Sequence, residues 1–160
     1  MTFYLLGLNK TIPLKDELKD DGIVVFQSTT LDLKATSVSD NTALNLIDSA
    51  GNIILHISIR RQAGTIVFNT KPANGGWANE DVIQLQNRFV GPSITVAVIS
   101  HPDRFQVLFD YHTVHYFIKR SKANAKSVAY GINAGQTNLL SETLGVTTYS
   151  SLAQVFSGGN

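Results

Sequence analysis

Short apolar segments rich in β-branched and aromatic residues recur along this chain, with turn residues about every 8–12 positions. The clearest of these segments are residues 22–28, 42–48, 52–60, 64–69, 93–99, 104–109, 113–118, 127–130 and 146–149. About a dozen strands would fit the chain at this spacing, and helix signals are sparse. The pattern therefore predicts an all-β fold, either a sandwich or a barrel.

Length and composition narrow the class of protein. At 160 residues the chain suffices for one core, so we expect a single domain over residues 1–160. A net charge of +1 gives no strong attraction to nucleic acid or anionic membranes. Cysteine is absent, which excludes disulfides and thiolate chemistry, and no apolar run approaches the ~18 residues of a membrane span. We expect no nucleic-acid partner, no membrane insertion and no cofactor.

The N-terminal sequence bears on location. Its first twelve residues, MTFYLLGLNKTI, lack a basic start, and Gly7 and Asn9 interrupt the apolar run. These residues predict a first strand rather than a signal peptide. We therefore expect a cytoplasmic protein, and export without a signal peptide stays open.

One predicted strand, residues 52–60, carries an unusual polar row. His56, Ser58 and Arg60 alternate with aliphatic residues, so they share one face of the strand. A solvent-exposed strand with no binding role would carry Thr, Lys or Glu at such positions. The row alone is also compatible with an ordinary solvated strand face.

A second predicted strand, residues 64–69, follows after a tight connection. If the two strands pair as a hairpin, Val67 and Asn69 face outward on the same side as His56 and Arg60. Four polar or basic groups, including the serine between His56 and Arg60, then converge on one patch. This convergence favours a binding surface.

The only tryptophan, Trp77, follows a turn-rich loop at residues 72–76 that has no apolar periodicity to bury it. An indole ring can stack on the C–H face of a pyranose, whose hydroxyls need fixed donors and acceptors. Glu80 supplies an acceptor, and Arg60 can orient it through a charge-assisted bond. The loop and the polar row together predict a saccharide platform.

Other chemistry has little support. His112 and His115 are three residues apart on a predicted hairpin, so we expect them on opposite faces and expect no shared metal. Nucleophile-elbow, P-loop, zincin and dinucleotide-binding motifs are absent. Glu80 and Asp81 are adjacent, which does not place two carboxyls across a glycosidic bond, although a distant second carboxylate stays open.

The motifs resemble the galectin carbohydrate-recognition signature in its fungal form. The matching residues are His56-x-Ser58-x-Arg60, then Val67-Phe68-Asn69, then Trp77-x-x-Glu80. Segments 21–28, 93–96 and 101–106 also look like this family, so the likeness covers essentially the whole chain. The chain is most similar to a variant group of mushroom galectin-related lectins, some of which favour chitooligosaccharides. The resemblance implies a two-sheet antiparallel β-sandwich, the galectin-type jelly roll, and a non-enzymatic lectin.

The resemblance also implies roles for the signature residues in carbohydrate binding. It implies that His56 contacts the axial hydroxyl of galactose and that Arg60 contacts the same hydroxyl and the ring oxygen. It implies that Asn69 contacts the exocyclic hydroxyl and that Trp77 stacks under the sugar ring. Glu80 would then contact the exocyclic hydroxyl and the next sugar.

Two positions depart from the family pattern. Ser58 stands where many animal members carry Asn. Val82 stands where the family usually has an Arg that pairs with the Glu and touches the second sugar. We therefore expect Val82 to alter specificity at the second sugar.

We expect a lectin that binds β-galactoside-type or N-acetylated oligosaccharides without turnover. The alternative within this class is specificity for chitooligosaccharides, that is, for N-acetylglucosamine. Rivals from other classes are a glycoside hydrolase on a sandwich and an interaction domain that binds no sugar. The expected partners are glycans and further copies of the chain in a dimer or tetramer, with Tyr111, Tyr116 and Phe117 as outer aromatic residues of the sheet.

Overall fold

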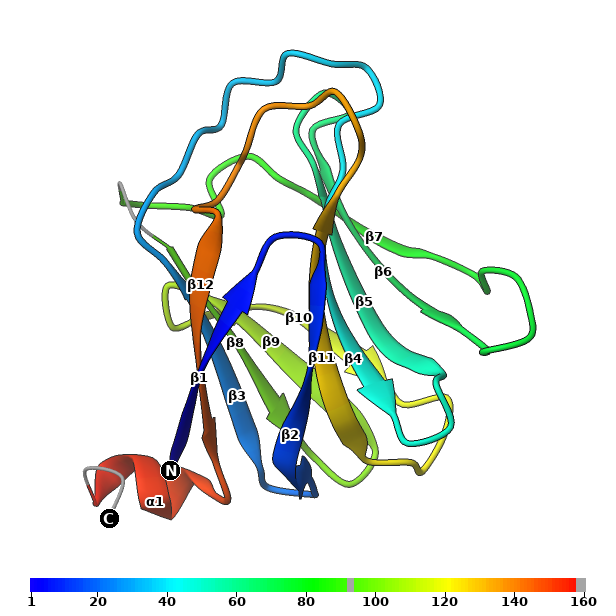
Figure 1. Ribbon diagram of the computed structural model, residues 1–160, viewed down its shortest axis with the longest axis vertical. Coiled ribbons are helices and arrows are strands. Elements are labelled where there is room, and N and C mark those ends of the chain that lie inside the picture. Colours follow the sequence, from blue (N-terminus) through cyan, green and yellow to red (C-terminus); the bar gives the residue numbers. More distant parts are fainter. Residues whose placement is uncertain (92–93, 158–160) are drawn as a thin grey trace.

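Two antiparallel six-stranded sheets pack face to face in the structure, a computed structural model that describes residues 1–91 and 94–157 (Figure 1). In spatial order the first sheet contains β1 (Thr2–Gly7), β12 (Thr143–Tyr149), β3 (Ile23–Ser28), β8 (Ile94–Ser100), β9 (Arg104–Phe109) and β10 (His112–Ile118). The second contains β2 (Lys10–Leu18), β11 (Ala125–Ile132), β4 (Thr42–Asp48), β5 (Ile53–Arg60), β6 (Thr65–Lys71) and β7 (Asp81–Gln84). The predicted all-β sandwich is confirmed.

The core fills the space between the two sheets. In β4, Leu44 and Leu46 are buried while Ala43, Asn45 and Ile47 beside them are half-buried, as alternation requires. The largest fully buried side chains include Phe26, Phe68, Phe109, Phe117 and Tyr130.

The expectation that Phe117 lies on the outer face is wrong. Successive strand residues point to opposite faces, so Tyr116, 48% exposed, points out and Phe117, 0% exposed, points in.

Each predicted strand is found within about three residues of its expected ends, although Ser93 lies outside the described residues. Three elements were missed. The N-terminal region forms two strands, β1 and β2, where one was expected. Strand β7 is a four-residue segment, and helix α1 (Leu152–Phe156) spans five residues. Neither is long enough to produce a clear hydrophobic period.

A β-bulge in β10 overturns the expectation for the two histidines. The register shifts between Thr113 and His115, so that His112 is opposite Phe109 and His115 is opposite Val107. Both partners are core residues, so the register places the histidines on the same side. Among residues 1–91 and 94–157, no group of three or more His, Cys, Asp or Glu could hold a metal ion.

The turn between β9 and β10 is the tight hairpin that the sequence predicted. Asp110 and Tyr111 both have positive φ, 50° and 66°, as a two-residue type I′ turn requires. Asp110 is suited to this conformation, and its Oδ1 accepts a hydrogen bond from Thr95 N at 3.1 Å.

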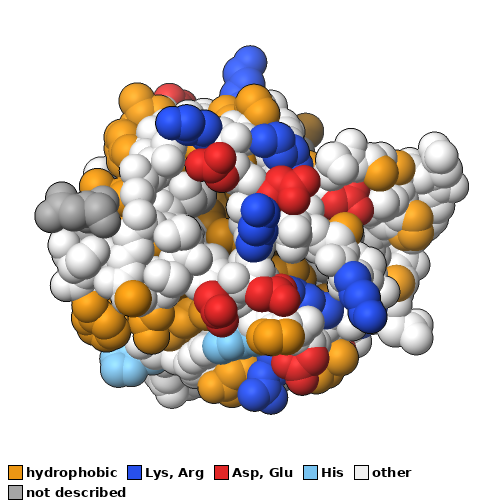
Figure 2. All heavy atoms as spheres, turned by 90° about the horizontal axis from the view of Figure 1, so that it is seen from below, with side chains coloured by type: hydrophobic (Ala, Val, Ile, Leu, Met, Phe, Trp, Pro, Cys, Tyr) orange, Lys and Arg blue, Asp and Glu red, His pale blue; other side chains and the backbone are white. Residues whose placement is uncertain are grey.

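On the face seen in Figure 2, Lys and Arg side chains lie beside Asp and Glu side chains, so both signs of charge are interspersed there. No helix within the described part of the chain is long and apolar enough to cross a membrane.

Two irregular segments frame the second sheet. Residues 29–41 pass over one end of the sandwich beside residues 133–142, and the loop between β6 and β7, residues 72–80, projects from its side (Figure 1). The first segment is fixed by a fully buried ion pair between Arg61 and Asp40, with Arg61 Nε 3.0 Å from Asp40 Oδ1. These two segments border the polar row.

Candidate functional site

The register of β5 and β6 brings the predicted polar residues onto one face. His56 is opposite Asn69, and Ser58 is opposite Val67. Directly opposed residues share a face of the sheet, so the predicted hairpin and its shared side are confirmed.

This face is much more buried than a solvated surface. His56 is 6% exposed, Ser58 0% and Asn69 2%, and Val67 is also buried. The row faces away from the core, as expected, but its side chains are mostly covered rather than solvated. The projecting loop covers part of the row, because the Trp77 ring lies 4.3 Å from the His56 ring, centroid to centroid, at 42°.

A pocket of about 330 Å³ opens over the row. Its lining residues are Asn41, His56, Arg60, Asn69, Trp77, Ala78 and Glu80. Five of the six predicted binding residues thus line one pocket. The sixth, Ser58, is fully buried and does not line it. Val82 follows Glu80 by two residues on β7 and is 51% exposed.

His56 presents a hydrogen-bond acceptor. Its Nδ1 lies 2.6 Å from Asn45 Oδ1, and because a carbonyl oxygen can only accept, Nδ1 carries the proton. Burial, aided by the positive charge of Arg60, lowers the pKa of His56 to about 4. The ring is therefore neutral at pH 7, and Nε2 is free to accept a hydrogen bond from a hydroxyl.

Arg60 is held on two sides. Its Nε donates to Ser58 Oγ at 3.0 Å, and the Ser58 hydroxyl donates in turn to Asn41 Oδ1. Its Nη2 lies 3.3 Å from Glu80 Oε2, which is the ion pair that the sequence suggested. The guanidinium has further N–H groups, so it can also donate to a ligand.

The side-chain amide of Asn69 is already hydrogen-bonded within the protein at both its nitrogen and its oxygen. Its Nδ2 donates to Ala78 O at 2.9 Å, and its Oδ1 accepts from Thr70 N at 2.8 Å. The second hydrogen on Nδ2 remains available for a ligand.

Asn41 is a pocket residue that the sequence reasoning missed. Its backbone N donates to Gln136 Oε1 at 2.7 Å, which fixes the chain just before β4. The only signal is that Asn41 continues the alternation of β4 on the side of Asn45. A lone Asn before a strand is equally typical of a turn, so nothing in the sequence singles it out.

Taken together, the pocket offers the neutral acceptor of His56, donors from Arg60 and Asn69, the carboxylate of Glu80, and an indole ring that is 50% exposed. No group in the described lining is arranged as a nucleophile beside a base. The arrangement suits reversible binding of a hydroxyl-rich ligand that also has an apolar face.

Comparison with known proteins identifies the family. The pattern of the galactoside-binding lectin family matches residues 11–137. The chain belongs to the galectin family. Its fungal relatives include Galectin-1 of Coprinopsis cinerea, 37% identical over 127 residues that cover 79% of this chain and 82% of that protein. Another is the anti-tumor lectin of Cyclocybe aegerita, 30% identical over 157 residues that cover 96% of this chain and 99% of that lectin.

A solved structure supports the same fold. Galectin LEC-6 of Caenorhabditis elegans superposes with a TM-score of 0.69 at 13% identity, covering 92% of this chain and 95% of that one. This galectin is therefore a non-enzymatic carbohydrate-binding lectin with a β-sandwich fold, as predicted, and the glycoside hydrolase alternative is set aside.

Proposed function

We propose that this galectin, as a single domain over residues 1–160, binds β-galactoside-type or N-acetylated oligosaccharides in the pocket over β5 and β6. The direct contacts in this proposal come from His56, Arg60, Asn69, Trp77 and Glu80. The observation that carries the proposal is the neutral acceptor of His56 beside the Arg60 donor and under the Trp77 loop.

These groups can select one hydroxyl. A sugar hydroxyl can donate to His56 Nε2 and accept from Arg60 at the same time, which a C–H group cannot do. The exposed ring of Trp77 can stack on the C–H face of the same sugar. A ligand that lacks the hydroxyl would leave both protein groups unpaired, at a cost of about 1–3 kcal/mol each.

Chitooligosaccharides are a second candidate ligand class, and Val82 favours them. Its side chain is 51% exposed, and it is opposite Val67, on the face of the sheet that carries the polar row. An apolar wall cannot donate to a hydroxyl, but it can contact the methyl of an acetamido group. N-acetylglucosamine oligomers would benefit from that contact.

A glycan array with wild-type protein and Trp77→Ala tests the proposal. We expect wild type to bind galactosides or N-acetylated oligosaccharides and Trp77→Ala to lose detectable binding. The melting temperature should change little, because half of the Trp77 surface is already exposed. Wild-type protein that bound no glycan would instead favour an interaction domain independent of sugar.

We also propose that the chain works as a homo-oligomer, a dimer or tetramer. Sugar sites of this shallow kind bind weakly, and linked sites raise avidity by roughly 10²–10⁴. The outer face of the first sheet is a candidate interface, because Phe3, Leu5, Tyr111 and Tyr116 are 62%, 66%, 69% and 48% exposed. Light scattering at micromolar concentration should give a multiple of the chain mass, and a strictly monomeric mass would contradict this proposal.

A further inference from the structure

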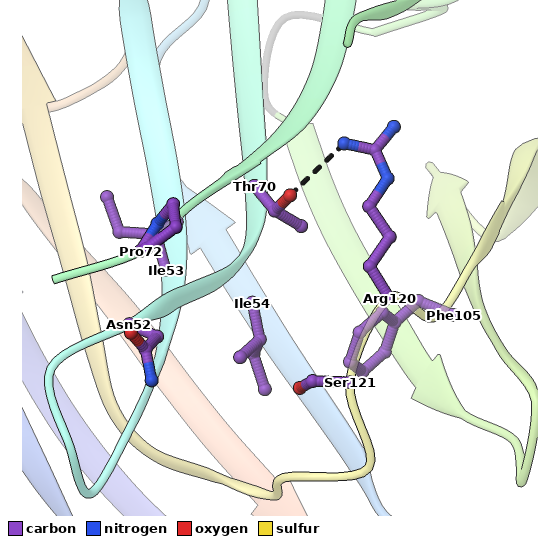
Figure 3. A pocket seen from close by; sticks show the side chains of 8 residues that line it. All are labelled: Asn52, Ile53, Ile54, Thr70, Pro72, Phe105, Arg120 and Ser121. Carbon is purple, nitrogen blue, oxygen red and sulfur yellow. Dashed lines mark hydrogen bonds between the residues drawn. The ribbon is translucent and has the colours of Figure 1, made fainter. Parts of the chain in front are cut away.

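A second cavity, of about 160 Å³, lies beside the base of the loop that carries Trp77. Its lining residues are Asn52, Ile53, Ile54, Thr70, Pro72, Phe105, Arg120 and Ser121 (Figure 3). These residues come from both sheets. Arg120 belongs to the connection between β10 and β11 and extends across the cavity to Thr70, with the hydrogen bond drawn in Figure 3.

The guanidinium of Arg120 connects the two ends of the loop. Its Nη1 donates to Asn69 Oδ1 at 3.0 Å and to Thr70 Oγ1 at 3.1 Å, near the end of β6. Its Nη2 donates to Asn79 O at 2.6 Å, just before β7 begins. A lysine could not match this, because a compact ammonium lacks the planar fork that reaches several acceptors at once.

Arg120 is itself fixed from the first sheet. Its guanidinium carbon lies 4.7 Å from the centroid of the Phe117 ring, and Phe117 is fully buried. Its Nη2 also lies 3.8 Å from Asp81 Oδ1. The side chain therefore spans from a rigid core residue to the base of a projecting loop.

Apart from the contact of the Trp77 ring with His56, the loop is held to the rest of the protein mainly toward its ends. Ala78 N donates to Thr70 O at 3.1 Å, and Ala73 N donates to Asn52 Oδ1 at 2.9 Å. Near the apex, a Cβ added to Gly76 would meet no atom within 4 Å. Order at Trp77 therefore depends on its ring contact with His56 and on how firmly the base of the loop is held.

We propose that Arg120 is a positioning residue for glycan binding, which keeps Trp77 and Glu80 in place by connecting both ends of the loop. This inference rests on the proposed function of the pocket. A loop already held in its binding position loses less conformational entropy when a ligand binds. If the loop occupied that position about a tenth of the time, the apparent Kd would rise about tenfold.

Arg120→Met tests the inference, with Arg104→Met as the matched control. Arg104 also stacks on an aromatic ring, at 5.0 Å from the centroid of Tyr116, but it lies on β9 in the first sheet and pairs with Asp103 instead of the loop. Because Trp77 is the only tryptophan, fluorescence anisotropy and acrylamide quenching of the ligand-free protein report directly on the loop. Calorimetry with lactose and with an N-acetylglucosamine oligomer gives the affinities.

We expect Arg120→Met to make Trp77 more mobile and easier to quench, and to weaken binding of the preferred probe about tenfold. Arg120→Lys should fall between wild type and Arg120→Met, and Arg104→Met should match wild type. If Arg120→Met does not fold, Arg120→Lys carries the same two measurements.

Unchanged Trp77 mobility in the Arg120 variants would overturn the inference, as would raised mobility with unchanged affinity. Wild-type protein that bound neither probe nor any glycan on the array would overturn the proposed function, and with it the role of Arg120 in binding. The ligand-free fluorescence distinguishes these two failures.

Discussion

The two walls of the pocket are built in different ways. The strand wall consists of Asn41, His56, Arg60 and Asn69, and the loop wall consists of Trp77, Ala78 and Glu80. His56 is 6% exposed and Trp77 is 50% exposed. The strand wall is thus part of the folded sheet, whereas the loop wall is attached to it.

The polar contacts of the strand wall are more buried than those of the loop wall. Ser58 is fully buried and ties Arg60 to Asn41 within the strand wall. On the loop wall, Glu80 reaches the strand wall through one ion pair, 3.3 Å long, whose partners are 33% and 45% exposed. Buried polar networks are costly to break, whereas exposed pairs contribute little to stability. Changes behind the strand wall should therefore affect folding and binding, and changes on the loop wall should affect mainly binding.

The largest expected effect is on stability, from Arg61→Met behind the strand wall. Arg61 and Asp40 are both fully buried, and removal of one partner leaves an uncompensated charge that costs about 3–5 kcal/mol. Urea unfolding should show this as a lower midpoint. Arg104→Met is the control, because its 3.8 Å pair with Asp103 is exposed and should contribute less than about 1 kcal/mol. Equal midpoints for the two variants would refute the claim that the buried ion pair behind the strand wall is costly to break.

Acidification should destabilise the strand wall through His56. The unfolded histidine takes up a proton near pH 6.5, whereas burial keeps the folded pKa at about 4. Between these values the unfolded state binds more protons, so the free energy of unfolding falls as pH falls from 6.5 to 4. The total is about 3 kcal/mol. His56→Gln should lack this part of the pH slope, as measured by urea unfolding at several pH values; an identical slope would contradict the argument.

Arg60→Ala, where the two walls meet, should weaken glycan binding. Hydrogen bonds to charged groups are worth about 1.5–3 kcal/mol, so calorimetry should show roughly a ten- to a hundredfold loss. Stability should fall less than in Arg61→Met, because the Arg60 side chain is 33% exposed. Arg88→Ala, outside the pocket, is the control. Normal binding by Arg60→Ala would place the site elsewhere.

The sequence predicted most of the residues that form the strand wall, but it did not predict which segments cover them. Period-two alternation placed His56, Ser58 and Arg60 on one side, and the register of β5 and β6 added Asn69. Alternation says which residues share a face, but it does not say what covers that face. The coverage comes from residues 29–41 and 72–80, whose courses depend on long-range contacts.

The site residues that the sequence analysis did not predict are likewise placed by long-range contacts. Asn41 reaches the pocket because the buried pair of Arg61 and Asp40 fixes the segment before β4. Arg120 is distant from the signature in sequence and meets the loop only after the two sheets pack together. The bulge in β10, which reoriented the expected faces of His112 and His115, likewise leaves no period in the sequence.

The smallest expected effect comes from Val82→Arg, on the exposed edge beside the loop wall. An arginine here would lie on the face of the polar row, two residues after Glu80, and would pair with its carboxylate, which is 45% exposed. Such an exposed pair is worth about 0.2–1 kcal/mol. We expect lactose affinity to rise up to about fivefold, because the new donor can meet a hydroxyl of the second sugar.

The same change should not help N-acetylated ligands. The apolar surface of Val82 that can contact an acetamido methyl would be replaced by a charged group with a strong need for water or an acceptor. Calorimetry of wild type, Val82→Arg and Val82→Leu against lactose and an N-acetylglucosamine oligomer separates the two effects. Val82→Leu keeps the apolar wall and should keep the wild-type preference, whereas Val82→Arg should shift it toward lactose. An unchanged preference in Val82→Arg would mean that the second sugar does not contact this edge of β7.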